Sequence, residues 1–139
     1  MTVKSQEFRF QTHSEGEILD ITDKVQKIVE SSKLRNGIAT LFVPGSTAAL
    51  TTIEYEPGLL SDFPQALERF APRDAVYEHE NRWHDRNGHS HVRASIIGPD
   101  LSVPFLAKRL TLGTWQQIVF VELDSRPRDR TVIVQLVGD

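Results

Sequence analysis

The stretch WQQIVFVELDSRPRDRTVIVQLV (residues 115–137) decides the fold, because it holds two long apolar runs separated by a charged segment. The runs WQQIVFVEL (115–123) and RTVIVQLV (130–137) are rich in valine, isoleucine and phenylalanine, which favour strands. The intervening DSRPRDR (124–130) contains a proline and three arginines, and a hairpin tip is its simplest interpretation. These runs indicate a sheet in the carboxyl-terminal part of the chain.

Further strands are expected upstream of this stretch. In SQEFRFQT (5–12), apolar and polar residues alternate as they do in a half-buried strand. GIATLFV (37–43) and TAALTTIEY (47–55) are separated only by a short Pro-Gly-Ser break, so we expect them to be neighbours in the sheet. A last candidate, SHVRASII (90–97), precedes the carboxyl-terminal pair.

Two helices are expected in the first half of the chain. LDITDKVQKIVESSKLRNG (19–37) has an apolar stripe at helical spacing and a terminating Asn36-Gly37, and SDFPQALERF (61–70) has a proline in the tolerated first turn. The candidate caps are Asp20 or Thr22 for the first helix and Ser61 or Asp62 for the second.

Helices and strands do not alternate as they would in βαβ units. The pattern therefore predicts an α+β protein with a mostly antiparallel, β-sandwich-like core and about two helices. We expect one domain over residues 1–139, because no linker, repeat or low-complexity segment interrupts the chain.

Composition excludes several classes of function. The net charge is −3, whereas nucleic-acid or anionic-membrane binding calls for a basic domain or stripe. The chain has no cysteine, so any metal must take nitrogen and oxygen ligands. No segment has the form of a signal peptide or the roughly 20 apolar residues of a membrane span. We expect a soluble, cytoplasmic protein that binds a small molecule.

The segment HENRWHDRNGHSHVRA (79–94) is the main candidate site, because it contains four of the five histidines. If 90–97 is a strand, His89 and His91 project from the same face, and His79 can fold back as a third ligand. Three imidazoles with one open position suit zinc, with manganese, nickel or magnesium as alternatives. Oxygen atoms are available from the carboxylates Glu54, Glu80 and Asp85. The alternative is a polar loop that binds no ion, and His84 fits that description best.

Two further groups of polar residues are candidates. Ser46 and Thr47 lie in a turn that can offer hydroxyl and N–H groups to an anion, although such a turn can equally be structural. Glu54 can serve as a base or ligand if it points toward the histidines; solvent exposure is the alternative. Arg126, Arg128 and Arg130 share one face of an extended segment and can clamp phosphate, or can pair with Asp124 and Asp129 at the surface.

The chain contains an ordered set of motifs: Tyr77-x-His79, Asn87 to His91 (NGHSH), Leu112 to Gln116 (LGTWQ), and Asp124 with Arg128 and Arg130. Together these motifs resemble the YjbQ-like family, UPF0047. The resemblance covers essentially the whole chain, including FVPGSTAALTTIEYEP before the histidine segment. Many members have a histidine before the Ser-Thr or Thr-Thr pair, where this chain has Gly45.

The resemblance implies a homotrimer with a metal-holding site near the subunit boundaries, and the activity of a secondary thiamine-phosphate synthase. That reaction joins hydroxymethylpyrimidine diphosphate to a thiazole phosphate and releases diphosphate. The alternatives are a metal-dependent hydrolase and a non-catalytic trimeric metal- or anion-binding protein. The residues expected to act are His89, His91 and Glu54 in catalysis; Ser46, Thr47, Arg128 and Arg130 on phosphate; and His79, His89 and His91 on the metal.

Overall fold

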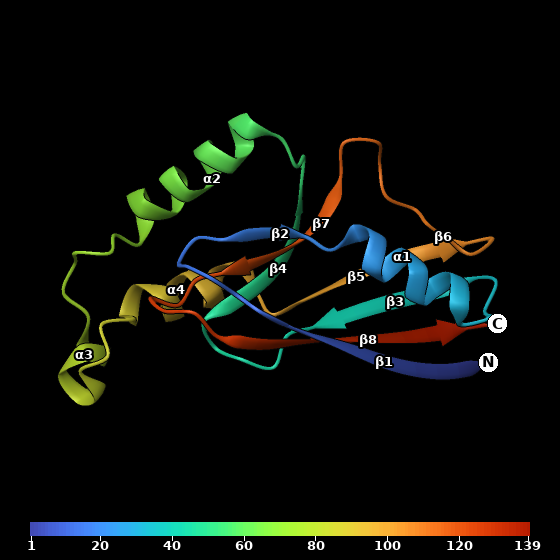
Figure 1. The fold of residues 1–139 in the computed structure, drawn as a ribbon, viewed down its shortest axis with the longest axis horizontal. Coiled ribbons are helices and arrows are strands. Elements are labelled where there is room, and N and C mark those ends of the chain that lie inside the picture. Colours follow the sequence, from blue (N-terminus) through green and yellow to red (C-terminus); the bar gives the residue numbers. More distant parts are fainter.

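The structure, a computed structural model, describes residues 1–139 and contains two antiparallel sheets and four helices (Figure 1). The larger sheet has the strand order β1-β8-β3-β5-β6, and the smaller one has the order β2-β7-β4. The predicted α+β class and antiparallel pairing are confirmed. The strands are β1 (Thr2–Gln11), β2 (Ile18–Asp20), β3 (Gly37–Phe42), β4 (Ala48–Ile53), β5 (Asp100–Leu106), β6 (Arg109–Leu110), β7 (Gln117–Glu122) and β8 (Asp129–Gly138). The helices are α1 (Thr22–Ser31), α2 (Pro57–Phe70), α3 (Glu78–Trp83) and α4 (Gly88–Ile97).

One apolar core joins the two sheets and helix α1. It includes Val25 and Val29 of α1, Leu41 of β3 and Phe120 of β7, all fully buried. A second cluster lies on the opposite face of the small sheet, where Val119 of β7 packs with residues of α2 and α4. Strand β7 is therefore buried on both faces, which explains why its sequence is a continuous apolar run rather than an alternating one.

The predicted strand at 90–97 is wrong, because these residues belong to helix α4. Ser90, Arg93 and Ala94 are buried at the spacing of one helix face, and Ala94 packs into the second cluster. Ile96 is 63% exposed, so the isoleucines that suggested a strand do not lie in the sheet. Helix α3 was not expected either, and the chain has four helices rather than two.

Two predicted pairings are also wrong. Strands β3 and β4 lie in different sheets: β3 pairs with β5 and β8, whereas β4 pairs with β7. Strands β7 and β8 also lie in different sheets, so residues 124–130 do not form a hairpin tip. Both connections cross between the sheets at the same end, where Leu123 N donates a hydrogen bond to Thr47 O at 3.0 Å. The candidate functional site is built around this crossing.

The two predicted helices are present with different ends. The N-cap of α1 is Ile21, which makes no side-chain cap hydrogen bond, rather than Asp20 or Thr22, although Asp20 accepts a hydrogen bond from Thr22 N at 3.0 Å. The helix ends at Ser31, ahead of the left-handed Lys33. Helix α2 begins earlier than expected, at Pro57, and its cap is Glu56 rather than Ser61 or Asp62. None of the four helices is both long and apolar enough to cross a bilayer.

Replacing Glu56 with alanine is expected to lower the free energy of unfolding by about 1 kcal/mol. The Glu56 carboxylate accepts hydrogen bonds from Gly58 N at 2.8 Å and from Leu59 N, so alanine leaves two helix-terminal donors without a partner. Urea unfolding followed by circular dichroism measures the change. Asp62→Ala is the control, because Asp62 lies inside the helix; a larger loss for Asp62→Ala would contradict this assignment of the cap.

The outer face of the large sheet carries exposed apolar side chains. Val3, Ile38 and Phe42 are 60%, 50% and 43% exposed, and Ile38 lies opposite Val137 in the sheet. Such a face is compatible with contacts between subunits. The homotrimer stays a prediction, which sedimentation measurement of the mass in solution would test.

Candidate functional site

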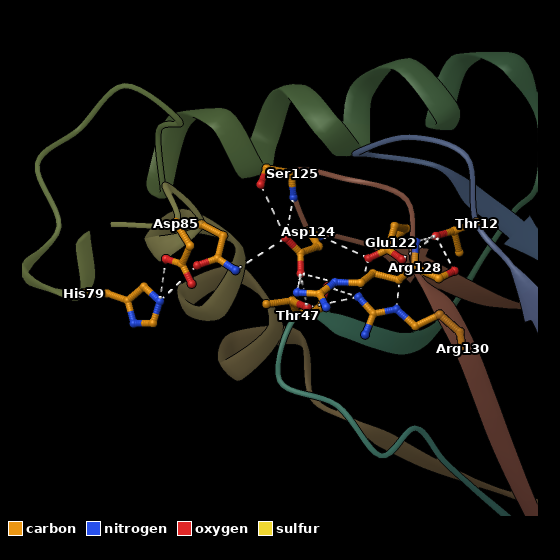
Figure 2. A network of polar contacts seen from close by, with 10 residues as sticks. Thr12, Thr47, His79, Asp85, Glu122, Asp124, Ser125, Arg128 and Arg130 are labelled. Atoms are coloured by element: carbon orange, nitrogen blue, oxygen red, sulfur yellow. Dashed lines mark hydrogen bonds and ion pairs between the residues drawn. The ribbon is translucent and has the colours of Figure 1, made fainter. Parts of the chain in front are cut away.

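A buried polar network fills the place where the two connections cross between the sheets (Figure 2). At its centre, Arg130 Nε donates to Glu122 Oε1 at 2.9 Å, and Nη2 donates to the other carboxylate oxygen. Glu122 is fully buried and Arg130 is 8% exposed, so each charge is neutralised by the other rather than by water. We call this the crossing network; its members are Thr12, Thr47, Glu122, Asp124, Arg128 and Arg130.

Asp124 extends the crossing network toward the histidine segment. Its Oδ2 accepts hydrogen bonds from Thr47 Oγ1 at 2.9 Å and from Arg128 Nε at 2.8 Å, and its Oδ1 accepts one from Ser125 N at 2.7 Å. Burial by itself raises the pKa of the carboxyl group, but these hydrogen bonds outweigh it and hold the pKa of Asp124 below its ordinary value. Asp124 is therefore a carboxylate at neutral pH.

Beyond Asp124, three side chains of the histidine segment meet. The Asn87 amide nitrogen lies 3.4 Å from Asp124 Oδ1, and its amide oxygen lies 2.9 Å from His79 Nε2. His79 Nε2 is also 3.1 Å from Asp85 Oδ1. With the amide turned about, its nitrogen lies 2.8 Å from Asp85 Oδ1. We call the three converging atoms, His79 Nε2, Asp85 Oδ1 and the Asn87 amide oxygen, the acceptor triangle.

The local backbone brings these atoms together. Helix α3, which carries His79, ends at His84 in the left-handed conformation, and Arg86 is left-handed as well. The chain thereby reverses within a few residues and starts α4 at Gly88. A Cβ at Gly88 would lie 2.5 Å from Tyr77 Cβ, so only glycine permits this close approach. The Asn87-Gly88 dipeptide thus aims Asn87 at His79.

His91 lies beside the acceptor triangle. Its ring centroid is 4.3 Å from that of His79, and the two rings are inclined at 48°. Burial lowers the pKa of His91, and the neighbouring His79 lowers it further, against the opposing effect of Asp85, Asp124 and Glu80. The His91 imidazole is therefore mainly neutral at pH 7 and able to accept a proton.

His89 points elsewhere, and the predicted convergence of three imidazoles is wrong. Residues two apart in a helix lie about 200° apart around its axis, so His89 and His91 cannot share a face of α4. His89 is buried and its Nε2 lies 2.6 Å from Glu15 Oε1, while the other Glu15 oxygen pairs with Arg73 at 3.1 Å. No three histidine, aspartate or glutamate side chains converge in a metal cage.

The structure also separates other predicted residues from the histidines. Glu54 is exposed and follows β4 at the end away from Thr47, roughly 20 Å along the chain by strand geometry. Ser46 is exposed in the crossing connection. The Thr47 hydroxyl is buried and bonded to Asp124 and Arg130, which leaves it no free donor for phosphate.

The two arginines of the predicted phosphate clamp differ. Arg130 is paired with buried Glu122, so its guanidinium faces a carboxylate of the protein, and its role as a phosphate ligand stays a prediction. The Arg128 side chain is 36% exposed and pairs with Asp124 at 2.7 Å, as one of the two alternatives for this segment expected. A Cβ at Gly45 would lie 3.0 Å from Arg130 Nη1, so the family's histidine at this position would crowd the buried guanidinium.

Sequence reasoning missed two residues of this region. Glu122 ends the apolar run of β7, and its burial could have been inferred from that position between apolar neighbours on a strand buried on both faces. The sequence singled out Asn87 only as part of the NGHSH motif. Its role depends on the separate placements of His79 and Asp124, for which the sequence has no local signal.

The acceptor triangle fits a divalent ion. With the Asn87 amide turned about, its nitrogen donates to Asp85 Oδ1 at 2.8 Å and to His79 Nε2 at 2.9 Å, so hydrogen bonds alone can join the three groups. Separations of 2.8, 2.9 and 3.1 Å match the roughly 3.0 Å between adjacent ligand atoms around an octahedral ion with bonds of about 2.1 Å. In the orientation that turns the amide oxygen toward His79 and Asp85, a cation could join the three atoms. One nitrogen and two oxygens suit manganese or zinc.

A polar cavity of about 670 Å³ opens beside the acceptor triangle. Asp85 belongs to both, so a ligand in the cavity would lie next to a bound ion. The cavity has room for a small molecule and an almost entirely polar wall, unlike the mainly apolar pockets of most small-molecule sites. Its lining residues are Arg73, Asp74, Ala75, Glu80, Asp85, Arg86 and Ser125.

Comparison with known proteins gives consistent relatives. The family model described as "UPF0047 protein YjbQ-like" matches residues 6–139. A UPF0047 protein of Methanothermobacter thermautotrophicus is 42% identical over 138 residues, covering 99% of this chain and 94% of its own. The crystal structure of a YbjQ-like protein of unknown function from Sulfolobus solfataricus P2 superposes with a TM-score of 0.90 at 34% identity, covering 99% of this chain and all of that one. The crystal structure of a hypothetical protein from Aeropyrum pernix K1 superposes with a TM-score of 0.85 at 33% identity, covering 96% of this chain and 99% of that one.

Proposed function

The chain belongs to the YjbQ-like family UPF0047, and on that premise we propose that it is a divalent-metal-dependent enzyme whose ion is held by His79, Asp85 and Asn87. One observation carries the proposal: His79 Nε2, Asp85 Oδ1 and one end of the Asn87 amide meet at separations of 2.8 to 3.1 Å, which match the distances between neighbouring metal ligands. Proteins rarely leave such groups facing one another unless a proton or an ion joins them.

Other residues of the chain have distinct roles in this proposal. In this proposal the Asn87 amide nitrogen faces Asp124 Oδ1 at 3.4 Å, which is the orientation that turns the amide oxygen toward His79. His91, neutral and adjacent to His79, takes or returns a proton at its imidazole. When bound, the ion supplies a Lewis acid that polarises an oxygen of the substrate or of water. The substrate occupies the cavity beside Asp85.

Two reactions are compatible with this arrangement. The resemblance suggests thiamine-phosphate synthesis, in which a thiazole nitrogen bonds to the pyrimidine methylene carbon while the carbon–oxygen bond to diphosphate breaks and diphosphate leaves with both electrons. That step requires no base. Hydrolysis of a phosphate ester requires proton removal from water, and the neutral His91 beside the acceptor triangle favours this second candidate. His89 and Glu54 have no part in either reaction, because neither lies at the acceptor triangle.

Removal and return of the metal test the proposal. After dialysis against a chelator, tag-free protein is expected to lose at least about 90% of its turnover and to regain it with Mn²⁺ or Zn²⁺. Both reactions are assayed: chromatography measures thiamine-phosphate formation, and a colorimetric assay measures phosphate release from simple monoesters. His91→Gln is expected to slow hydrolysis about 100-fold or more and to spare the transfer reaction.

The control is His84→Asn, because His84 lies in the same segment, forms no contact with the acceptor triangle, and asparagine tolerates its left-handed backbone. It should retain full activity. Turnover that survives complete metal removal would contradict the proposal. Stoichiometric metal binding without turnover in either assay would instead favour the non-catalytic binding protein.

A further inference from the structure

Strand β1 is the last strand on one side of the large sheet, and its outer edge has no partner strand (Figure 1). It pairs with β8 in one unbroken register, without a bulge or a proline to interrupt the edge. Thr12 N donates to Arg128 O at 2.9 Å in the same register, so the even-numbered residues of β1 form the bonds to β8. The backbone groups that face outward, free to pair with a further strand, belong to Val3, Ser5, Glu7 and Arg9.

Helix α1 lies beside this edge and forms a groove with it. Two cavities between them, of about 340 and 160 Å³, share three lining residues and are therefore continuous. At one end of the groove the Lys24 ammonium lies 5.1 Å from the centre of the Phe8 ring, and at the other end Lys4 donates a hydrogen bond to Ser32 O. Helix α1 therefore lies antiparallel to β1 along the length of the groove.

The groove is basic, although the chain as a whole has a net charge of −3. Three of the five lysines of the chain, Lys4, Lys24 and Lys27, line the two cavities, and no carboxylate lines either of them. None of the three lysines forms an ion pair, and Glu30 of α1 is paired with Arg109 instead, at 3.2 Å. Positive charge that the protein does not neutralise thus lies along an unpaired strand edge, where it attracts an acidic partner.

We propose that this edge binds an extended acidic segment of another polypeptide, which pairs antiparallel with β1 and places acidic side chains on the side of α1. All strand pairs of the large sheet are antiparallel, and the addition of a strand is a common mode of peptide recognition. Side chains on one face of a strand recur about every 7 Å, and Lys24 and Lys27 lie about 4.5 Å apart along α1 on long flexible stems. Two acidic residues separated by one other residue can therefore meet both ammonium groups.

A second copy of the chain fits this edge less well. The β1 side chains on the α1 side of the sheet include Lys4, Gln6 and Phe8, and none of the side chains on that side is acidic. A second β1 that continued the sheet with its own α1 on the same side would bring another Lys4 toward Lys24 and Lys27, which repel it. The chemistry of the groove therefore selects an acidic partner.

Fluorescence anisotropy at low salt tests this inference with a capped, labelled peptide of about eight residues in which glutamate and threonine alternate. The peptide is expected to bind at least about 10-fold more tightly than the same peptide with glutamine in place of glutamate. With the glutamates toward α1, the threonine amides are those that pair with β1. N-methylation of the threonine amides should therefore weaken binding by about 10-fold or more, whereas N-methylation of the glutamate amides should change it by no more than about threefold.

Lys24→Gln combined with Lys27→Gln should weaken binding of the glutamate peptide by about 10-fold or more and leave binding of the glutamine peptide within about twofold. The matched control is Lys33→Asn combined with Lys108→Asn, which removes two lysine charges outside the two cavities. Both of these residues have a φ of 68°, which asparagine tolerates. The control should leave affinity for the glutamate peptide within about twofold.

Ser5→Pro tests the strand edge itself. Proline removes the outward N–H at this position and leaves the bonds to β8 in place, so peptide binding should weaken by about 10-fold or more. Ser5→Ala removes only the hydroxyl, which bonds to Gln135 at 2.9 Å, and should bind within about twofold of the unaltered protein. Thermal melting verifies that both variants fold, and the N-methylated peptides decide the question even if Ser5→Pro does not.

Three kinds of result would overturn the inference. The first is equal affinity for the glutamate and glutamine peptides, or an equal effect of the two N-methylations. The second is a DNA single strand that binds more tightly than the glutamate peptide and is weakened by the lysine changes but not by Ser5→Pro, which would assign the groove to nucleic acid. The third is self-association that sedimentation detects in the unaltered protein and not in Ser5→Pro, which would assign the edge to a second copy.

Discussion

Replacing Arg130 with alanine is expected to lower the free energy of unfolding by about 3–5 kcal/mol. The substitution leaves Glu122 fully buried with its charge uncompensated, because the two Arg130 donors are replaced by nothing. It also removes the donor that bonds Thr47 at 3.0 Å, and so loosens both connections of the crossing network. Denaturant unfolding followed by tryptophan fluorescence and circular dichroism measures the change.

Two further variants show whether the cause is the ion pair. Arg126→Ala removes an exposed arginine from the same connection and should change stability by no more than about 0.5 kcal/mol. Arg130→Met combined with Glu122→Leu removes both charges, and should be less destabilising than either single change because no buried charge is left alone.

The result also decides between two interpretations of Arg130. If Arg130 is a structural partner of Glu122, its removal lowers the free energy of unfolding. If Arg130 is a phosphate ligand, its removal weakens phosphate binding and changes the free energy of unfolding little. If the free energy of unfolding of the Arg130→Ala protein lies within about 1 kcal/mol of that of the unaltered protein, and phosphate binding is weakened, Arg130 is a phosphate ligand.

The strands that could be predicted are those with a strong apolar period. Strand β8 alternates fully buried Val132, Val134 and Leu136 with more exposed neighbours, so its position was evident from sequence. Pairing was harder to predict, because β3 and β4 are adjacent in the chain yet belong to different sheets. A short connection can cross between two packed sheets as readily as it can close a hairpin. Which of the two occurs here depends on β7, a strand distant in the sequence that is buried on both faces and pairs with β4.

The error at 90–97 had the largest effect on the site. Val92, Ile96 and Ile97 favour a strand locally, but helix α4 buries Ala94 against the small sheet, and this tertiary packing outweighs the local preference. Strand geometry paired His89 with His91, whereas helix geometry separates them. His79 and His91, two of the three predicted ligands, are nevertheless close in space. They meet because α3 folds back over the start of α4, and not because they share a strand.

Asp85→Asn is expected to weaken Mn²⁺ binding by at least about 100-fold, which corresponds to about 2.7 kcal/mol of binding free energy. The substitution keeps the shape of the side chain and removes its charge at an atom 3.1 Å from His79 Nε2. The Asp85 side chain is 46% exposed, so folding should be unaffected within about 0.5 kcal/mol. Electron paramagnetic resonance of free Mn²⁺ in titrations with each protein measures the affinity.

The control for this prediction is chosen to separate ligation from attraction. Asp74→Asn removes the same charge from the wall of the same cavity, but Asp74 forms no contact with His79 or Asn87. General attraction of a cation by the carboxylates acts through solvent and is screened by salt, so losing one such charge should cost no more than about fivefold in affinity. Equal losses in the two variants, both shrinking as salt is added, would mean that Mn²⁺ only accumulates near an acidic cavity. A loss confined to Asp85→Asn and insensitive to salt requires direct coordination, because only a bond to the ion depends on which carboxylate is removed.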